Sequence, residues 1–320
     1  MEIDYAKTYQ GFIDDEMEQA SATEWMTANE GQVRWSGGKD VDVAALTTTG
    51  LGNYDSTKTD GTAYPAGAVT SSWESKTLSM DRGVKFALDR TSPEDIGFAA
   101  NAESVIREFT RSQLAKEQDT YRIQKLYAAA AADETYGATH VVEFTEGTDD
   151  LVEKICKLAE TLENDSERTG GFVALVAANH KSDFMKASAD KYYNIRFEQK
   201  MEINGIVYEH VMMLNDLPCL FVPASRMKTA LDVQSGREGE TAGGILADTD
   251  ALQIYALIAA CDAPLAVAKI DSLKQFGPEE NQLFDGTAIQ ARYLYDLYVA
   301  DNKVVTLGAL VEKSTETDGD

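Results

Sequence analysis

Three histidines are the first candidates for chemistry in this chain of 320 residues, because imidazole is a frequent general base and metal ligand near neutral pH. They are His140, His180 and His210. None stands at the spacing of a metal-binding pair, and the sequence contains neither an H-E-x-x-H motif nor a G-x-S-x-G motif around a nucleophilic serine. His210 falls on a predicted strand, where a structural role is the better interpretation. The sequence therefore predicts no catalytic residue and no enzyme.

Glycine-rich and acidic stretches offer two further kinds of chemistry, phosphate binding and cation binding. The Gly-Gly-Lys-Asp sequence at 37–40 lacks both the preceding glycine and the following hydroxyl residue of a phosphate loop. The glycine-rich stretch 236–244 carries two acids and is interpreted as a surface loop. The acidic runs 14–16 and 149–150 do not follow the spacing of a calcium-binding loop. We therefore expect no cofactor and no metal.

Composition and charge exclude several classes of protein. With 29 Lys and Arg against 54 Asp and Glu, the net charge is −25, so the chain is repelled by nucleic-acid backbones. No apolar run approaches the roughly 18 residues of a membrane helix, and the acidic start of the sequence is unlike a signal peptide. Cys156, Cys219 and Cys261 lie apart, without C-x-x-C spacing, which fits a reducing cytoplasm. We expect a globular protein without a membrane partner.

The first 80 residues predict an arm and a long excursion. Residues 1–28 are polar and acidic, with a short helix predicted near 12–26. Residues 29–80 contain seven glycines, and Val33, Trp35 and later Trp73 alternate with polar residues. This pattern predicts a long two-stranded excursion with a flexible tip, and excursions of that length tend to be functional.

Residues 94–132 give the strongest local signal, a helix that contains no Pro and only one Gly, Gly97. Thr91 and Pro93 provide a capping hydroxyl and a first-turn proline, and an apolar stripe follows that is blurred near 113–120. A helix of this length would extend about 58 Å, which is far beyond the usual core helix.

The remaining sequence mixes helices and strands. A capped helix is predicted from 151, buried strands at 172–178 and 252–260, and a hairpin at 195–214 around the Asn204-Gly205 turn. A long alternating strand covers 289–299, and 313–320 form a polar tail. The predicted class is α+β.

The order of these parts, with three particular stretches, resembles the major capsid protein of tailed bacteriophages, which has the Hong Kong 97-type fold. The stretches are 86–95 with 107–109 and 119–122, then Leu-Pro-Cys-Leu-Phe-Val-Pro-Ala-Ser-Arg-Met at 217–227, and 290–299 with 301–303. The resemblance implies an N-terminal arm at 1–28, an extended E-loop hairpin at 29–80, and a peripheral domain at 81–133 with the spine helix at about 94–132. It further implies a mainly axial domain at 134–300, a peripheral-domain hairpin near 195–214, and a final strand with a polar tail at 301–320.

The same resemblance implies a structural protein that self-assembles, as pentamers and hexamers, into the icosahedral head shell around phage double-stranded DNA. The expected partners are further copies of the chain, a separate scaffolding protein, a portal, and packaged DNA bound without sequence specificity. The expected location is the virion, after assembly in the bacterial cytoplasm. From their positions, eight residues are expected at contacts between subunits: Trp35, Gly37, Gly38, Tyr54, Tyr64, Trp73, Arg107 and Arg111.

Two alternatives stay open. An encapsulin-like nanocompartment shell has the same fold, although the long Gly- and Thr-rich excursion favours the phage protein. A monomeric ligand-binding protein could instead use 29–80 to grip a ligand and 134–310 as its pocket domain.

Overall fold

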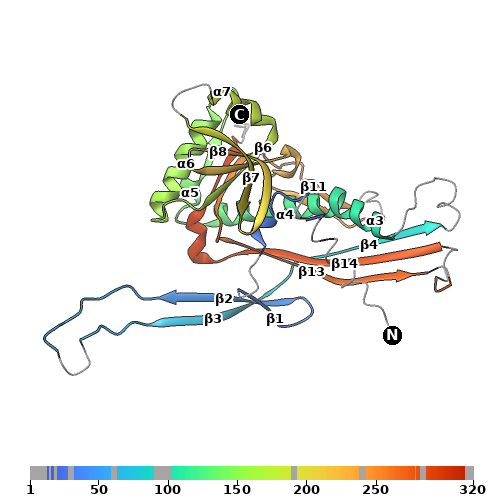
Figure 1. Cartoon of the computed structure of the whole chain (residues 1–320), viewed down its shortest axis with the longest axis horizontal. Coiled ribbons are helices and arrows are strands. Elements are labelled where there is room, and N and C mark those ends of the chain that lie inside the picture. Colours follow the sequence, from blue (N-terminus) through green and yellow to red (C-terminus); the bar gives the residue numbers. More distant parts are fainter. Residues whose placement is uncertain are drawn as a thin grey trace, which may run out of the picture. The chain divides into compact units, whose positions relative to one another are not determined.

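The computed structural model describes residues 13, 16, 17, 20–27, 32–58, 63–89, 102–188, 193–237, 243–277, 279–281 and 286–313. The chain divides into two compact units, one formed by Ala28–Ser79 and the other by Met1–Thr27 with Met80–Asp320 (Figure 1). Both helices and sheets are present, which confirms the predicted α+β class. No helix within these ranges is long and apolar enough to cross a membrane.

The smaller unit is an antiparallel sheet rather than the predicted pair of strands. Its strands, in spatial order, are β1 (Val33–Trp35), β2 (Asp40–Thr48) and β3 (Val69–Thr77). The additional strand β1 forms because the chain turns back at once, with the amides of Ser36 and Gly37 donating to the carbonyl of Asp40. That turn opposes Trp35 to Val41.

The larger unit contains a seven-stranded mixed sheet. Its spatial order is β5 (Val141–Phe144), β15 (Leu307–Glu312), β12 (Ile254–Ala260), β6 (Phe172–Ala177), β9 (Leu217–Val222), β8 (Ile206–Leu214) and β7 (Ile195–Ile203). Strands β6 and β12 are buried along their whole length, as their continuous apolar sequences predict. The helix α6 (Leu151–Asp165) packs on β15. Asp150 caps its N-terminus, because the Asp150 carboxylate accepts from the amides of Val152 and Glu153.

A second, three-stranded sheet holds the longest strands. It consists of β13 (Pro264–Phe276), β14 (Gly286–Val299) and β4 (Met80–Asp89), all antiparallel with β14 in the middle. Its apolar residues share a core with Ile13 and Met17 of the arm and with Ile106 and Leu114 of the long helix. The arm is therefore part of this unit's packing.

The long helix is present through the described residues 102–132. It runs as α3 (Ala102–Phe109), a π-helical turn (Thr110–Leu114) and α4 (Ala115–Ala132), whereas its predicted start at 91–95 lies outside the described residues. A π turn rotates the residues that follow it, which accounts for the blurred apolar stripe. After the turn, Ile123, Leu126 and Ala130 face the core of the seven-stranded sheet.

The strand pairing of two segments bears on the predicted domain boundaries. The hairpin at 195–214 has the expected turn, with positive φ at Asn204 and Gly205, but it extends the seven-stranded sheet because β8 pairs with β9. Conversely, β13 and β14 lie within the predicted axial range 134–300 but pair with β4, beside the long helix. The division into a peripheral and an axial domain remains a prediction, and the sheet topology shows only which strands each sheet contains.

Smaller elements complete this unit. They are η1 (Glu24–Met26), α5 (Gly137–His140), η3 (Ala178–His180), α7 (Lys181–Ala187), η4 (Ala224–Arg226), η5 (Asp301–Thr306) and a ribbon of β10 (Leu231–Gln234) with β11 (Gly244–Ala247). Strands β10 and β11 flank the glycine-rich stretch that was predicted as a surface loop. Residues 238–242 of that stretch lie outside the described residues.

Gly308 on β15 permits the close packing of α6. A Cβ atom at this position would lie 3.0 Å from a methyl carbon of Leu158 and 3.1 Å from one of Leu162. We expect Gly308→Val to lower the free energy of unfolding by about 1–3 kcal/mol through overpacking. Urea unfolding measures the loss, with Gly83→Val on β4 as the control, because the nearest atom to its added Cβ is a carbonyl oxygen at 3.6 Å. Equal stability of the two variants would contradict the expectation.

Candidate interaction surfaces

The histidines occupy three separate environments. His140 is buried, stacks on Tyr136, and has Nε2 2.8 Å from a carboxylate oxygen of Asp165. His180 is also buried, with Nδ1 2.9 Å from Asp183. His210 lies exposed on β8 with φ of 59°. Across the described ranges, no group of three or more His, Cys, Asp or Glu side chains could hold a metal ion.

The cysteines are poor nucleophiles in this structure. Burial raises the pKa of Cys156 to about 11 and that of Cys219 to about 12, and it also raises the pKa of Cys261. A thiol with such a pKa stays protonated near neutral pH, and the thiolate is the reactive form. Cys219 lies in the core of the seven-stranded sheet, as its apolar surroundings predict.

The smaller unit leaves large apolar side chains in solvent. Trp35 and Trp73 are 41% and 49% exposed, and every residue of β3 is exposed. The Arg34 guanidinium lies 5.0 Å from the Trp73 ring centroid and pairs with Asp42 at 2.8 Å. The hydrogen bond from Arg34 lowers the pKa of Asp42. The strands are thus ordered while their indole rings stay accessible.

The segment beyond β2 and before β3 is more exposed still. Tyr54 and Tyr64 contact each other with ring centroids 4.8 Å apart, and Tyr64 is 77% exposed. Leu51 in this segment and Val69, the first residue of β3, are also exposed. Exposed apolar side chains that gather in one segment are common at protein interaction sites. Gly37 and Gly38 lie in the β1–β2 turn, apart from this segment in sequence.

The two arginines singled out on the long helix have partners within the chain. Arg107 lies 3.2 Å from a carboxylate oxygen of Glu16, and so connects the helix to the arm. Arg111 pairs with Glu108 at 2.7 Å in an exposed part of the helix. These intrachain ion pairs reduce the charge that either arginine offers to another molecule.

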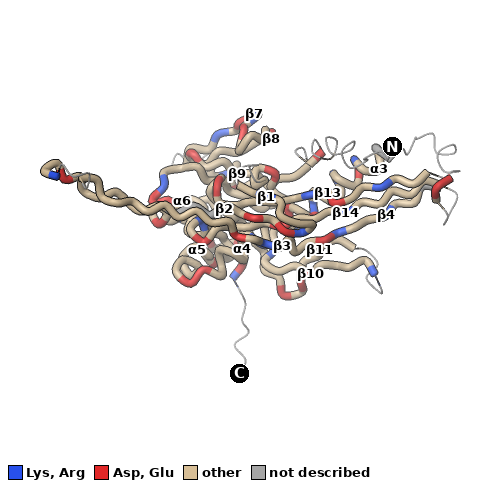
Figure 2. The backbone as a smooth tube through the Cα atoms, turned by 90° about the horizontal axis from the view of Figure 1, so that it is seen from below, with Lys and Arg blue, Asp and Glu red and all other residues tan. Residues whose placement is uncertain are grey.

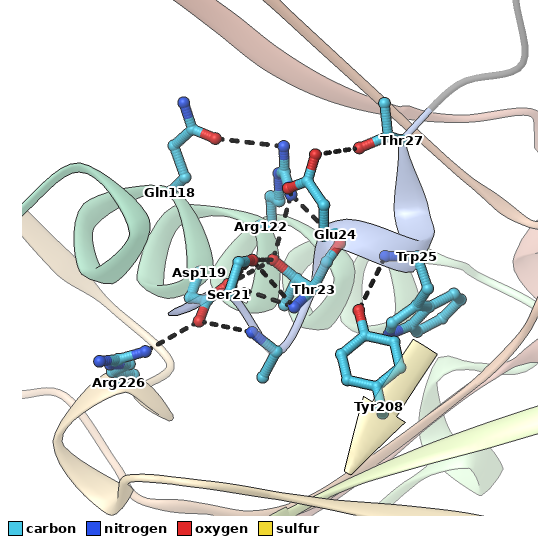
Figure 3. Close-up of polar contacts among 11 residues, drawn as sticks. Ser21, Thr23, Glu24, Trp25, Thr27, Gln118, Asp119, Arg122, Tyr208 and Arg226 are labelled. Carbon is cyan, nitrogen blue, oxygen red and sulfur yellow. Dashed lines mark hydrogen bonds and ion pairs between the residues drawn. The ribbon is translucent and has the colours of Figure 1, made fainter. Parts of the chain in front are cut away.

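A buried polar cluster around Asp119 is absent from the sequence-based predictions. The Asp119 carboxylate on α4 is fully buried and accepts from the hydroxyls of Ser21 (2.6 Å) and Thr23 (2.5 Å) (Figure 3). It also accepts from the amides of Ala22 (3.1 Å) and Thr23 (3.2 Å) and from Arg226 (2.9 Å). Five donors to one carboxylate fasten the arm and the loop after β9 to the helix.

Arg122 extends this cluster by one helical turn. Its buried guanidinium donates to the carbonyl of Thr23 (3.1 Å), to Glu24 (3.0 Å) and to Gln118 (3.2 Å). A guanidinium with several hydrogen-bond acceptors and a carboxylate partner can remain buried because its charge is matched. The sequence does contain a signal for this cluster. Two charged residues, Asp119 and Arg122, stand on the side of the long helix that is otherwise apolar.

The arm continues from this cluster to the other sheets. The Trp25 ring is buried. The backbone amide of Trp25 donates to the Tyr208 hydroxyl at 3.0 Å, and the Asn204 side chain donates to the Trp25 carbonyl at 2.9 Å. Thr27 then forms a parallel bridge to Ala266 on β13. Residues 21–27 thus join the long helix, the β7–β8 hairpin and the three-stranded sheet.

Two further networks stabilise the three-stranded sheet. Arg82 pairs with Glu117 at 2.7 Å, and Glu117 accepts from the Tyr295 hydroxyl at 2.6 Å. Arg292 on the central strand bridges Asp81 and Asp271, each at 2.7 Å, on the strands either side. The hydrogen bond to Asp81 raises the pKa of Arg292. Both networks connect neighbouring elements, the first joining β4 and β14 to α4 and the second joining the three strands.

Comparison with known proteins identifies the fold. No family model matches the chain, and no curated protein matches its sequence. Among solved structures, the capsid of cyanophage P-SCSP1u is similar with a TM-score of 0.57 and 13% identity, over 92% of this chain and 89% of that chain. The capsid of Ralstonia phage GP4 has a TM-score of 0.53 and 8% identity, over 94% and 93%. A structure from Mycobacterium phage Cain has a TM-score of 0.50 and 15% identity, over 93% and 92%.

Proposed function

We propose that this chain, which has the fold of phage capsid proteins, is the subunit of an icosahedral head shell that encloses double-stranded DNA. The observation that carries the proposal is the extent of the structural likeness, which covers about nine-tenths of this chain and of the capsid proteins. The confirmed resemblance concerns the fold, and the shell, its DNA and its location in the virion are the functions that we infer from it.

On this proposal the parts of the structure take separate roles in the shell. The unit containing β1–β3 is the E-loop, which lies on a neighbouring subunit and buries Trp35, Tyr54, Tyr64 and Trp73 there. The Gly37-Gly38 turn, Arg107 and Arg111 are proposed contacts of the same kind. The three-stranded sheet with the long helix is the peripheral domain, and the seven-stranded sheet is the axial domain of the pentamers and hexamers.

The strong negative charge suits such a shell. A net charge of −25 disfavours tight binding of packaged DNA, whose phosphates carry the same sign. The same charge opposes the approach of subunits, so salt or a partner must screen it during assembly. We propose a separate scaffolding protein, a portal, and assembly in the bacterial cytoplasm.

Electron microscopy of the purified chain, alone and co-expressed with its scaffolding protein, tests this function. We expect closed shells, or rings of five and six subunits, in moderate salt. Nuclease-resistant DNA inside infection-derived particles would distinguish a phage head from an enzyme-filled compartment. Monomers alone under both conditions, with a ligand-dependent melting shift, would instead support a ligand-binding protein.

The exposed aromatic residues of the smaller unit are the sharpest local test. We expect the double substitution Tyr64→Ser and Trp73→Ser to reduce the assembled fraction by roughly tenfold or more, because buried aromatic anchors dominate interface energies. The melting temperature of the unassembled chain should change little, since both rings are exposed. Met185→Ser on α7 removes another exposed apolar side chain and serves as the control. Unchanged assembly of the double variant would contradict the proposed role of this unit.

A further inference from the structure

Strand β7 forms an open edge of the seven-stranded sheet. It is nine residues long and pairs with β8 on one side, and no described strand pairs with it on the other. All of its residues from Arg196 to Lys200 are exposed. An exposed edge of this length presents unpaired amide and carbonyl groups to any strand that can match its side chains.

The side chains of β7 alternate in two ways. Arg196, Glu198, Lys200 and Glu202 follow one another on one face with charges that alternate in sign. The other face carries Ile195, Phe197, Gln199, Met201 and Ile203, of which Ile203 is buried and Phe197 is 52% exposed. Acidic and basic positions intermix along the β7–β8 hairpin in Figure 2.

We propose that β7 pairs antiparallel with β7 of a second copy of this chain, about a twofold axis that places Gln199 opposite Gln199. In this register Arg196 lies opposite Glu202 of the second copy, and Glu198 lies opposite Lys200. Each of these opposite-charge pairs occurs twice because of the symmetry. On the other face Phe197 lies opposite Met201, an aromatic–thioether pair that covers the exposed ring.

Neighbouring registers are excluded by charge and by side-chain direction. Moving the centre by one residue places Glu198 opposite Glu198 or Lys200 opposite Lys200, and like charges in direct opposition are destabilising. Registers that pair odd with even positions put the apolar side chains of the two copies on opposite faces. The centred register alone matches every charge over the full strand and gives a closed, self-complementary contact.

The intrachain contacts of β7 leave its acids available. Within the described ranges, Glu198 and Glu202 have no ion-pair partner, and the residues opposite them on β8 are Val211 and Val207. Lys200 contacts Glu209 at 3.3 Å and Arg196 contacts Asp216 at 3.5 Å, in pairs that remain exposed. A second copy therefore supplies cationic partners for two carboxylates that have none among the described residues of their own chain.

The net charge of −25 on each copy opposes this association, and ionic strength decides the balance. At about 0.15 M salt the screening length is about 8 Å, whereas directly opposed side chains on paired strands lie about 5 Å apart. Repulsion between the two whole copies is thus screened more than the cross-strand pairs. The resulting dimer is a state of the unassembled chain and does not depend on the proposed shell.

Sedimentation velocity in 0.15 M salt, below the concentration at which larger assemblies form, tests the proposal. We expect a concentration-dependent dimer of the parent chain. Glu198→Lys with Glu202→Lys should raise the dimer dissociation constant by roughly a hundredfold, because every cross-strand pair becomes repulsive. Glu134→Lys with Glu160→Lys makes the same charge change at exposed positions outside the hairpin and should not weaken the dimer.

A mixing experiment separates direct pairing from damage to the fold. The variant Arg196→Glu with Lys200→Glu has an all-acidic edge and should also be monomeric alone. When it is mixed with the all-basic Glu198→Lys, Glu202→Lys variant, a heterodimer should form, because opposite charges again face each other. A monomeric parent chain, a dimer that survives the paired Glu→Lys changes, or the absence of a heterodimer would overturn the proposal. Shell assembly is not a readout, so this failure is distinguishable from failure of the proposed function.

Discussion

Asp119→Asn is expected to lower the free energy of unfolding by about 3–5 kcal/mol, although it replaces one side chain by another of the same shape. The reason is that Asp119 is fully buried and accepts from five donors, one of which belongs to the Arg226 guanidinium. An asparagine side chain carries an NH2 group in place of one of the two carboxylate oxygens. The donors that bonded to that oxygen therefore lose their acceptor. The charge of Arg226 is then left without its counterion.

Urea unfolding measures the loss, and amide hydrogen exchange locates it. We expect protection of the Ala22 and Thr23 amides to fall more than that of the β6 amides, because the arm is released first. Asp250→Asn, an exposed change in a loop, should stay within about 0.5 kcal/mol of the parent. Ser21→Ala removes a single donor and should cost only about 1 kcal/mol. A loss below 1 kcal/mol for Asp119→Asn would show that the cluster does not hold the arm.

The second large effect is expected in alkaline solution. Burial raises the pKa of Tyr208, Tyr293 and Tyr295 above the usual value of 10.0, to about 12 in the case of Tyr293. Below pH 10 the three hydroxyls are protonated in both the folded and the unfolded chain, so they contribute no pH dependence to the free energy of unfolding. Above pH 10 the unfolded chain releases protons that the folded chain retains, so stability falls as the pH rises. Each tyrosine contributes a slope of about 1.4 kcal/mol per pH unit, and all three together about 4 kcal/mol.

Tyr293→Phe isolates one of these contributions. The ring and its contact with Phe109 are kept, while the titrating hydroxyl is removed. Unfolding free energies measured in urea between pH 8 and pH 11.5 should show a slope above pH 10 that is shallower by about 1.4 kcal/mol per pH unit than in the parent. Identical slopes for Tyr293→Phe and the parent would refute the assignment.

Local patterns predicted most of the individual elements. The apolar stripe predicted the long helix, a capped helix was predicted from 151, where α6 begins, and the Asn204-Gly205 turn predicted the β7–β8 hairpin. The continuous apolar runs of β6 and β12 predicted buried strands. These features depend on residues within a few positions of one another, so a single sequence reports them well.

The residues predicted at contacts between subunits remain predictions. The exposure of Trp35, Tyr54, Tyr64 and Trp73 is consistent with their prediction as contact residues, but their contacts with another subunit remain a prediction. Arg107 was predicted as an intersubunit contact, and the structure pairs it with Glu16 of its own chain. The sequence did not predict that pairing because the two residues are far apart in the chain.

The sequence by itself determined the class, the principal helices and strands, and the resemblance to phage capsid proteins that the fold confirms. Only the tertiary structure decided which strands are neighbours, which placed the 195–214 hairpin in the seven-stranded sheet and β13–β14 beside β4. It also brought Ser21 and Arg226 to Asp119. Alternation along a strand reveals which face is buried, but it carries no information about the partner strand. The pairing of β4 with β14 and the contacts of Asp119 join residues about a hundred or more positions apart, and these contacts form only when the chain packs.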